Sequence, residues 1–236
     1  MRYTRHDLKQ DKFKESAAEA VHEVVEHRST YIRLIVAVIV VAVVVSGLWW
    51  FYSSREEQSS AALGKAMLTY SAPVVPPTTP IPAGITAFTS DQDRLAASKK
   101  AFYEISDKYG WTHSGQYARY MAGVSESELG NFKVAEDQLR ALTSVRRKEL
   151  AALAKLALAS VYRQEGREAD AINLLQGLMD KPSESVPKVN AQLALADLYV
   201  AGHQNDKARL IYEAIAKENP KGALNQIARE HQEELK

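Results

Sequence analysis

The sequence contains no cysteine. Disulfide bonds, C-x-x-C redox motifs and cysteine nucleophiles are therefore excluded. This absence is compatible with a domain outside the cytoplasm that is stable without disulfides, although it does not identify a compartment.

Familiar catalytic and metal-binding motifs are also missing. The chain has no Walker phosphate loop, no G-x-S-x-G and no H-E-x-x-H. His22 and His27 lack zinc-protease spacing, and Glu126 and Glu128 point to different sides of a helix, so they form no acid/base pair by spacing. We predict no enzyme activity, no cofactor and no metal. The alternative is a hydrolase or lipid-modifying enzyme whose site only the fold assembles.

The chain has no large excess of charge of either sign. It has 30 basic and 29 acidic residues and a net charge of +1. This balance leaves no electrostatic footprint for nucleic acid. The local basic triplet at residues 146–148 is interpreted as a solvated turn between repeats, with a phosphate or lipid site as the alternative.

One long apolar run is present. From Leu34 to Tyr52 no residue is charged, and as a helix this run would span about 28 Å, close to the hydrocarbon thickness of a bilayer. Aromatic residues crowd its C-terminal end, where they favour the level of the lipid headgroups. We predict a single transmembrane helix that acts as an uncleaved signal-anchor. A buried core helix or strand and a cleaved signal peptide are the alternatives.

The flanking charges predict the orientation of the span. Within about twenty residues, four basic residues precede it and two follow it: Lys12, Lys14, Arg28 and Arg33 before, Arg55 and Lys65 after. The bias favours a cytoplasmic N-terminus and a C-terminal domain on the other side of the membrane.

The rest of the chain is predicted to be all-α. Residues 1–30 carry a helical apolar stripe and are predicted to be a cytoplasmic segment with an amphipathic helix, which lies on the membrane or docks on a partner; a marginal helix without a target is the alternative. Residues 31–53 form the transmembrane helix, and residues 54–90 a juxtamembrane helix (54–70) and a proline-rich connector. Residues 91–236 form a repeat domain, whose first helix has Asp91 as its predicted N-cap and ends near residues 109–110.

The repeat has a period of 36 to 37 residues. Gly130 aligns with Gly166, Tyr162 with Tyr199, and Ala171 with Ala208. In the last unit His203 stands at the turn, and in the first unit Glu126 stands where an aromatic is expected. Pro182 and Pro220 follow the second and third units. One such unit cannot cover its own apolar face, so neighbouring units are expected to stack into an α-solenoid, with residues 222–236 as a terminal cap.

These units resemble the tetratricopeptide repeat, which has a small residue and an aromatic in its first helix, Gly at the turn, and Ala in its second helix. The whole layout, from EVVEHRSTYIRLIVAVIVVAVVVSGLWWFYSSREEQSSAALGKAM through the repeats, is similar to the YfgM-like ancillary subunits of the Sec translocon. That resemblance implies a bacterial inner-membrane protein that faces the periplasm and associates with the translocon and with periplasmic chaperones. The proline-rich segment 72–84 departs from a compact version of that domain.

The resemblance to tetratricopeptide solenoids also predicts a binding surface, because their first helices line the concave face. The repeat register assigns these positions to it: Tyr117, Tyr120, Ser127, Arg163, Gln164, Asn190 and Asp197. The two tyrosines have the alternative of filling the packing between repeats, and Leu153, Leu156 and Leu193 are either groove floor or core.

Taken together, these features predict a membrane-anchored adaptor without enzyme activity. Its expected partners are translocon subunits, periplasmic chaperones or client chains. A scaffold for cell-envelope, outer-membrane or division complexes is the alternative within the same architecture. An oligomeric structural element is another, and the sequence does not determine the oligomeric state.

Overall fold

The computed structural model describes residues 28–78, 80, 84–218 and 223–235. The chain divides into two compact units, Met1–Ser54 and Arg55–Lys236. The described residues are mainly helical and contain one isolated β-bridge but no strand, so the all-α prediction is confirmed. Of the predicted amphipathic segment 1–30, only residues 28–30 are described. The helix stop predicted at Pro220 also lies outside the described residues.

The apolar run lies within helix α2 (Arg28–Tyr70). This helix has 43 residues, and its most apolar 18-residue window has a mean hydropathy of 2.7 with none of the window buried. Trp49 and Trp50 are each 70% exposed. By length and composition α2 can cross a membrane, and hydrocarbon is the solvent in which such an exposed apolar surface is stable.

From Arg55 onward, α2 packs as part of the second unit. Its small and apolar residues contact Phe102 and Ile105 of α3 (Asp91–Tyr109) and the helix that follows; these residues are Ala62, Leu63, Ala66, Met67 and Tyr70. The buried hydroxyl of Thr112 donates to that of Ser59 across 3.1 Å. The predicted helix over residues 54–70 is therefore the first helix of a pair with α3.

The N-terminus of α3 differs from the prediction by one residue. Ser90, not Asp91, is the N-cap: its backbone is extended and its hydroxyl accepts the N–H of Asp93 across 3.1 Å. Asp91 is instead in the first turn, where its carboxylate pairs with Arg94 at 2.7 Å. There its negative charge also interacts favourably with the positive end of the helix dipole. The predicted end of this helix near residues 109–110 is confirmed.

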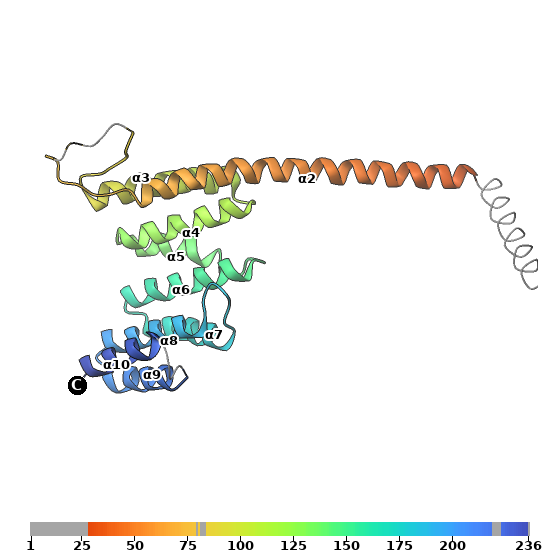
Figure 1. Ribbon diagram of the computed structural model, residues 1–236. Helices are drawn as coiled ribbons and strands as arrows, with labels where there is room; N and C mark the ends of the chain where they lie inside the picture. The colour runs from red at the N-terminus through yellow and green to blue at the C-terminus, as the bar shows by residue number, and fades with distance from the viewer. Residues whose placement is uncertain (1–27, 79, 81–83, 219–222, 236) are drawn as a thin grey trace, which may run out of the picture. The chain divides into compact units, whose positions relative to one another are not determined.

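Three further helix pairs follow, stacked in chain order (Figure 1). They are α4 (His113–Glu128) with α5 (Phe132–Arg140), α6 (Lys148–Gln164) with α7 (Glu168–Asp180), and α8 (Lys188–Ala201) with α9 (Asn205–Glu218). Helix α10 (Ala223–Glu234) packs on α9 and buries Ala228, as a terminal cap does. The solenoid predicted from the 36- to 37-residue period is confirmed.

The turn within each pair uses the same backbone geometry. In the middle turn the N–H of Arg167 donates to the carbonyl of Tyr162 (2.8 Å), and that of Gly166 donates to Arg163 (3.1 Å). This two-bond pattern is the Schellman motif, which requires a left-handed residue after the helix. The residues with positive φ in the three turns are Gly130 (79°), Gly166 (71°) and His203 (56°).

The proline-rich connector is fixed at its ends. Val75 donates its N–H to the carbonyl of Phe88 (2.8 Å), and Phe88 donates to Pro73 (3.0 Å), which forms the bridge between Val74 and Phe88. Proline has no N–H to donate, so these two bonds use the carbonyl of Pro73 and the N–H groups of Val75 and Phe88. The described residues between α2 and α3 contain no helix, in agreement with the proline content.

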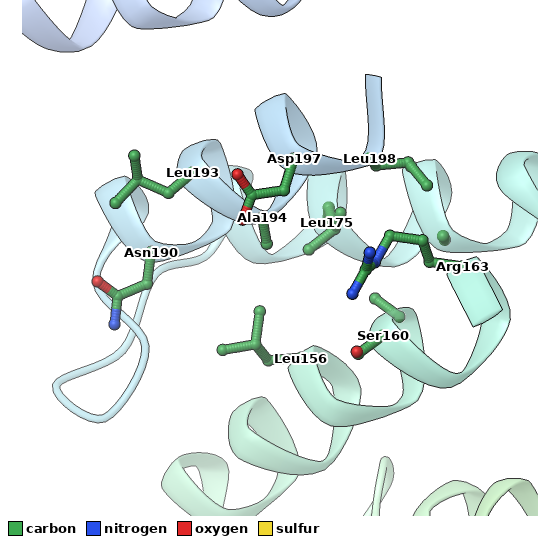
Figure 2. A pocket seen from close by; sticks show the side chains of 11 residues that line it. Leu156, Ser160, Arg163, Leu175, Asn190, Leu193, Ala194, Asp197 and Leu198 are labelled. Atoms are coloured by element: carbon green, nitrogen blue, oxygen red, sulfur yellow. The ribbon is translucent and has the colours of Figure 1, made fainter. Parts of the chain in front are cut away.

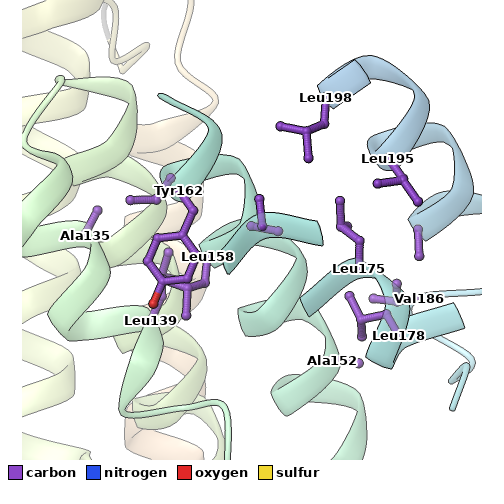
Figure 3. Close-up of a cluster of buried hydrophobic side chains, with 14 residues drawn as sticks. Ala135, Leu139, Ala152, Leu158, Tyr162, Leu175, Leu178, Val186, Leu195 and Leu198 are labelled. Carbon is purple, nitrogen blue, oxygen red and sulfur yellow. The ribbon is translucent and has the colours of Figure 1, made fainter. Parts of the chain in front are cut away.

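The largest core cluster joins α5, α6, α7 and α8 (Figure 3). Leu139, Tyr162 and Leu175 each lie at a face shared by two helices and are at most 6% exposed. Small residues let the helices approach: a Cβ on Gly123 would lie 2.8 Å from Cγ of Leu139. Each pair therefore buries its apolar surface against its neighbours, which is how a solenoid obtains a continuous core.

Candidate functional site

The first helices of successive pairs form one continuous row. Helix α4 contacts α6, and α6 contacts α8. In the described part of the chain the second helices, α5, α7 and α9, do not contact one another. The row of α4, α6 and α8 is therefore the inner side of the stack, where a partner can contact several repeats at once.

A hollow of about 380 Å³ opens between α6 and α8, with α7 at its base. Figure 2 shows Leu156, Ser160 and Arg163 contributed by α6, and Asn190, Leu193 and Asp197 contributed by α8. Leu175 of α7 closes the base. The hollow has an apolar interior and polar groups at its margin, which is typical of a binding site for a mixed polar and apolar ligand.

A second hollow of about 310 Å³ lies between α4 and α6. Tyr120, Val124 and Ser127 line it from α4, and Leu153 and Leu156 are among those that line it from α6.

The two hollows share Leu156 and Ser160. They therefore lie on adjacent sides of these α6 residues, and we call the two hollows together the inner groove, which is lined by α4, α6 and α8. Its length across three repeats suits an extended segment better than a small molecule.

The polar side chains of the inner groove are largely uncommitted. Within the described residues, neither the guanidinium of Arg163 nor the side-chain amide of Asn190 has a hydrogen-bond or ion-pair partner, and the carboxylate of Asp197 accepts only a long bond of 3.5 Å from the hydroxyl of Tyr212. A guanidinium and an amide can donate to the backbone carbonyls of a partner, and a carboxylate can accept from its N–H groups. The groove can therefore satisfy the backbone of an extended chain while it buries apolar side chains.

Tyr120 lines the end of the groove at α4, and two further tyrosines lie beside the lining residues Tyr120 and Glu128. The rings of Tyr117 and Tyr120 are 5.5 Å apart at their centroids. The hydroxyl of Tyr70 donates to the carboxylate of Glu128 at 2.7 Å. Burial and this bond raise the pKa of Tyr70 to about 12, and burial together with the neighbouring Tyr117 raises the pKa of Tyr120. These phenols stay protonated at neutral pH and serve as packing surfaces with a hydrogen-bond donor.

The seven predicted site residues fall into three groups. Arg163, Asn190 and Asp197 line the first hollow, and Tyr120 and Ser127 line the second. Tyr117 is half-buried among core residues of α4 and α6 and lines neither hollow. Gln164 is exposed at the end of α6, also outside both. Leu156 and Leu193 are groove lining and also pack against the core clusters.

Ser160 and Val124 are among the groove residues that the sequence analysis missed. Ser160 and Val124 line the groove at the positions that correspond to Asp197 in the two preceding repeats, 37 and then 36 residues earlier. The repeat register contained this signal. It was overlooked because a serine and a valine in a helix carry no chemistry of their own.

Two buried glutamates, Glu126 and Glu136, lie outside the groove and hold neighbouring helix pairs together. Glu126, at the position of an expected aromatic, is 5% exposed and accepts hydrogen bonds from Tyr103 (3.1 Å) and Asn131 (2.7 Å). Its carboxylate also pairs with Lys99 at 3.4 Å. All of these hydrogen-bond and ion-pair partners are side chains of the same domain, so Glu126 stabilises the fold. In the described residues no group of three His, Asp or Glu is placed to hold a metal ion.

Comparison with known protein families gives a match over most of the chain. The sequence profile of a tetratricopeptide repeat-like domain matches residues 26–231. No curated protein and no solved structure matches the chain.

Proposed function

Because this chain belongs to the tetratricopeptide repeat-like domain family, we propose that it is a protein-binding adaptor without catalytic activity, and that the inner groove holds an extended segment of its partner. Domains of this kind typically bind proteins and are not enzymes. The observation that carries the proposal is that two adjacent hollows share Leu156 and Ser160 in their linings. A groove that crosses three repeats buries more of an extended chain than either hollow alone.

The long apolar helix supports a membrane-anchored form of this adaptor. Helix α2 is long and apolar enough to span a bilayer, and its basic N-terminal flank favours a cytoplasmic N-terminus. A tether of this kind raises the effective concentration of the repeat domain near partners in the same membrane. The repeat domain then faces the opposite side, which is the periplasm in a bacterial inner membrane.

The partner we propose is the Sec translocon together with periplasmic chaperones or exported client chains. The support is the layout, in which an N-terminal span leads directly into a tetratricopeptide-like domain, as in the YfgM-like ancillary subunits. Exported chains emerge unfolded, and an unfolded chain is the extended ligand that the inner groove suits.

Photo-cross-linking in cells tests the proposal. A benzoylphenylalanine replaces Asn190 or Ser127 in the full-length protein, and the adducts are identified by mass spectrometry. We expect translocon subunits, periplasmic chaperones or nascent exported chains. Gln176, exposed on α7 and outside the groove, is the matched control position.

The outcomes separate the two parts of the proposal. Equal adducts from position 176 and from the groove positions contradict the groove as the binding site. Groove-specific adducts with envelope-assembly or division proteins retain the adaptor and overturn the translocon assignment. An alkaline phosphatase fusion at the C-terminus checks the orientation, since that reporter is active only outside the cytoplasm.

A further inference from the structure

A third hollow, of about 510 Å³, lies apart from the inner groove. Its walls are the start of α6, the end of α7 and the two loops that flank these helix ends. Helix α6 gives Lys148, Ala151 and Lys155 to this hollow, whereas it gives Leu153, Leu156 and Ser160 to the groove. No lining residue is shared, so two ligands can bind the two places independently.

Three lysines surround this hollow, which we call the lysine hollow. They come from two separate stretches of chain: Lys148 and Lys155 from α6, and Lys181 from the residue after α7. Within the described residues, none of the three ammonium groups has a hydrogen-bond or ion-pair partner. Three positive charges around one hollow favour an anionic ligand, because the ligand supplies the negative charge that the lysines lack within the protein.

The one acidic residue in the lining does not neutralise these lysines. The carboxylate of Glu149 accepts the backbone N–H of Ser185 at 2.7 Å, in the loop between α7 and α8. Its bonds to this loop lower the pKa of Glu149. Glu149 therefore acts as an anchor for the loop that forms one wall.

The wall is held in place by further bonds. The N–H of Ser183 donates to the carbonyl of Val186 (3.1 Å), and the N–H of Val186 donates to the hydroxyl of Ser183 (3.1 Å). The side chain of Val186 is fully buried in the main core cluster. The hollow is thus formed before a ligand arrives, which lowers the entropy cost of binding.

The interior of the lysine hollow is apolar. Val145, Leu178 and Pro182 line it together with the lysines. A free phosphate would pair with the lysines and leave this surface in contact with water. A lipid surface would present its phosphates as a flat layer, whereas these lysines surround a concavity. A protein segment with a large apolar side chain between acidic residues uses both the charges and the apolar interior.

We propose that the lysine hollow is a second docking site, and that it binds an acidic segment of a partner protein with an apolar side chain at its centre. The apolar side chain enters between Val145 and Leu178, and the flanking carboxylates pair with Lys148, Lys155 and Lys181. The site is separate from the inner groove, so a partner can be held there while an extended chain occupies the groove.

Peptide binding to the full-length protein tests this site. The protein is placed in phosphatidylcholine nanodiscs, and the fluorescence anisotropy of a labelled GEELFEEG peptide is measured at low salt. Two peptides serve as controls: GQQLFQQG lacks the charges, and GEEGGEEG lacks the apolar side chains. We expect saturable binding of GEELFEEG and at least tenfold weaker binding of each control peptide.

Matched protein variants assign the binding to the hollow. The triple variant Lys148→Gln, Lys155→Gln, Lys181→Gln is expected to weaken GEELFEEG at least tenfold. The control Lys65→Gln, Lys100→Gln, Lys217→Gln removes the same charge from exposed lysines that line neither the inner groove nor the lysine hollow, and it is expected to bind within twofold of wild type. Circular dichroism verifies that both triple variants are folded. If the Lys148, Lys155, Lys181 variant is not folded, each of the three single variants is expected to weaken GEELFEEG binding instead.

Several results would overturn the proposal. These are an absence of GEELFEEG binding up to millimolar concentration, equal binding by the triple variant, or equal binding of either control peptide. Inorganic phosphate or phosphatidylglycerol vesicles that bind through the three lysines when the peptide does not would identify an anion or lipid site instead. None of these results depends on the function of the inner groove.

Discussion

The hydroxyl of Tyr162 donates a hydrogen bond to the carboxylate of Glu136 across 3.2 Å, and so joins α6 to the second helix of the preceding repeat. Glu136 is only 2% exposed. The same carboxylate pairs with Arg140 and, at 3.0 Å, with Arg167, whose guanidinium also lies over the ring of Tyr162. One buried anion thus connects two repeats through Tyr162 and Arg167.

Substitution of Glu136 is expected to destabilise the domain. Glu136→Ala leaves the buried hydroxyl of Tyr162 without its acceptor and Arg140 without its counter-ion, whereas Arg167 keeps its pairs with Glu165 and Asp170. We expect a loss of about 1–3 kcal/mol in the free energy of unfolding, since both arginines stay partly in water. Urea unfolding of the full-length protein in detergent measures it. The control Asp137→Asn removes an exposed carboxylate next in sequence and should cost at most about 0.5 kcal/mol.

Acid is expected to weaken the same network. Burial raises the pKa of Glu136, but the hydrogen bonds from Arg167 and Lys133 and the charge of Arg140 outweigh burial and hold the pKa below 4.5. Glu56, which accepts the N–H groups of His113 and Ser114, likewise has a lowered pKa: its bonds to Ser114 and His113 outweigh burial.

The sign of the pH effect follows from these shifts. Between the folded pKa values and 4.5 the unfolded chain binds more protons, so this stabilisation is complete above pH 4.5 and is lost as the pH falls through the folded values. Unfolding free energies at pH 7, 5, 4 and 3 should therefore decline in the acid range. Glu136→Gln should flatten that decline, and an unchanged slope in this variant would contradict the assignment.

Replacement of His203 by glycine is expected to stabilise the turn between α8 and α9. Its φ of 56° is left-handed, and the equivalent residues in the other two turns are glycines. His203→Gly relieves the Cβ contact that penalises this conformation and should stabilise the protein by about 0.5–1 kcal/mol, whereas Gly166→Ala introduces the contact and should cost about 1–2 kcal/mol. Gly177→Ala, within α7 and with open space around it, should be neutral or stabilising. Thermal unfolding of the three variants under one condition provides the comparison.

Gly115 is expected to tolerate no side chain. A Cβ at this position would lie 1.9 Å from the carbonyl oxygen of Tyr109, where α3 ends and α4 begins. The obstacle is backbone, so Gly115→Ala must move one helix end and should cost about 1–3 kcal/mol. Gly64→Ala, on α2 with nothing within 4 Å, is the control and should not destabilise. Equal melting temperatures for the two variants would show that the backbone at this junction moves readily to accommodate a Cβ.

Arg163 allows a test of binding that leaves the fold intact. It has no ion-pair partner among the described residues, so Arg163→Ala should change the unfolding free energy by less than about 0.5 kcal/mol. If the guanidinium contacts the partner, the same variant should lower the yield of photo-adducts from position 190 severalfold. A full yield of adducts would remove Arg163 from the binding surface.

The repeat architecture was accessible from the sequence because its signals are local. The Schellman turns depend on residues at fixed offsets, so Gly130, Gly166 and His203 predicted where each pair turns. The N-cap of α3 was misplaced by one residue because Ser90 and Asp91 both have side chains that can accept the N–H groups of a first turn. Which of them does so depends on the backbone at Ser90.

Other features depend on residues brought together only by packing. Glu126 was an anomaly in the repeat pattern, and its partners Lys99 and Tyr103 belong to a different helix pair. The lysine hollow joins the ammonium groups of Lys148 and Lys181, which are too far apart in sequence for any spacing rule.

The sequence by itself determined the apolar helix, the helical repeats and their turns, since helix periodicity and left-handed turn residues act over a few positions. Only the tertiary structure decided that Leu156 and Ser160 line two adjacent hollows, and that three lysines line a third. The physical reason is that hollows form where side chains from different helices fail to fill the space between them. That outcome depends on the distance and angle at which the helices pack.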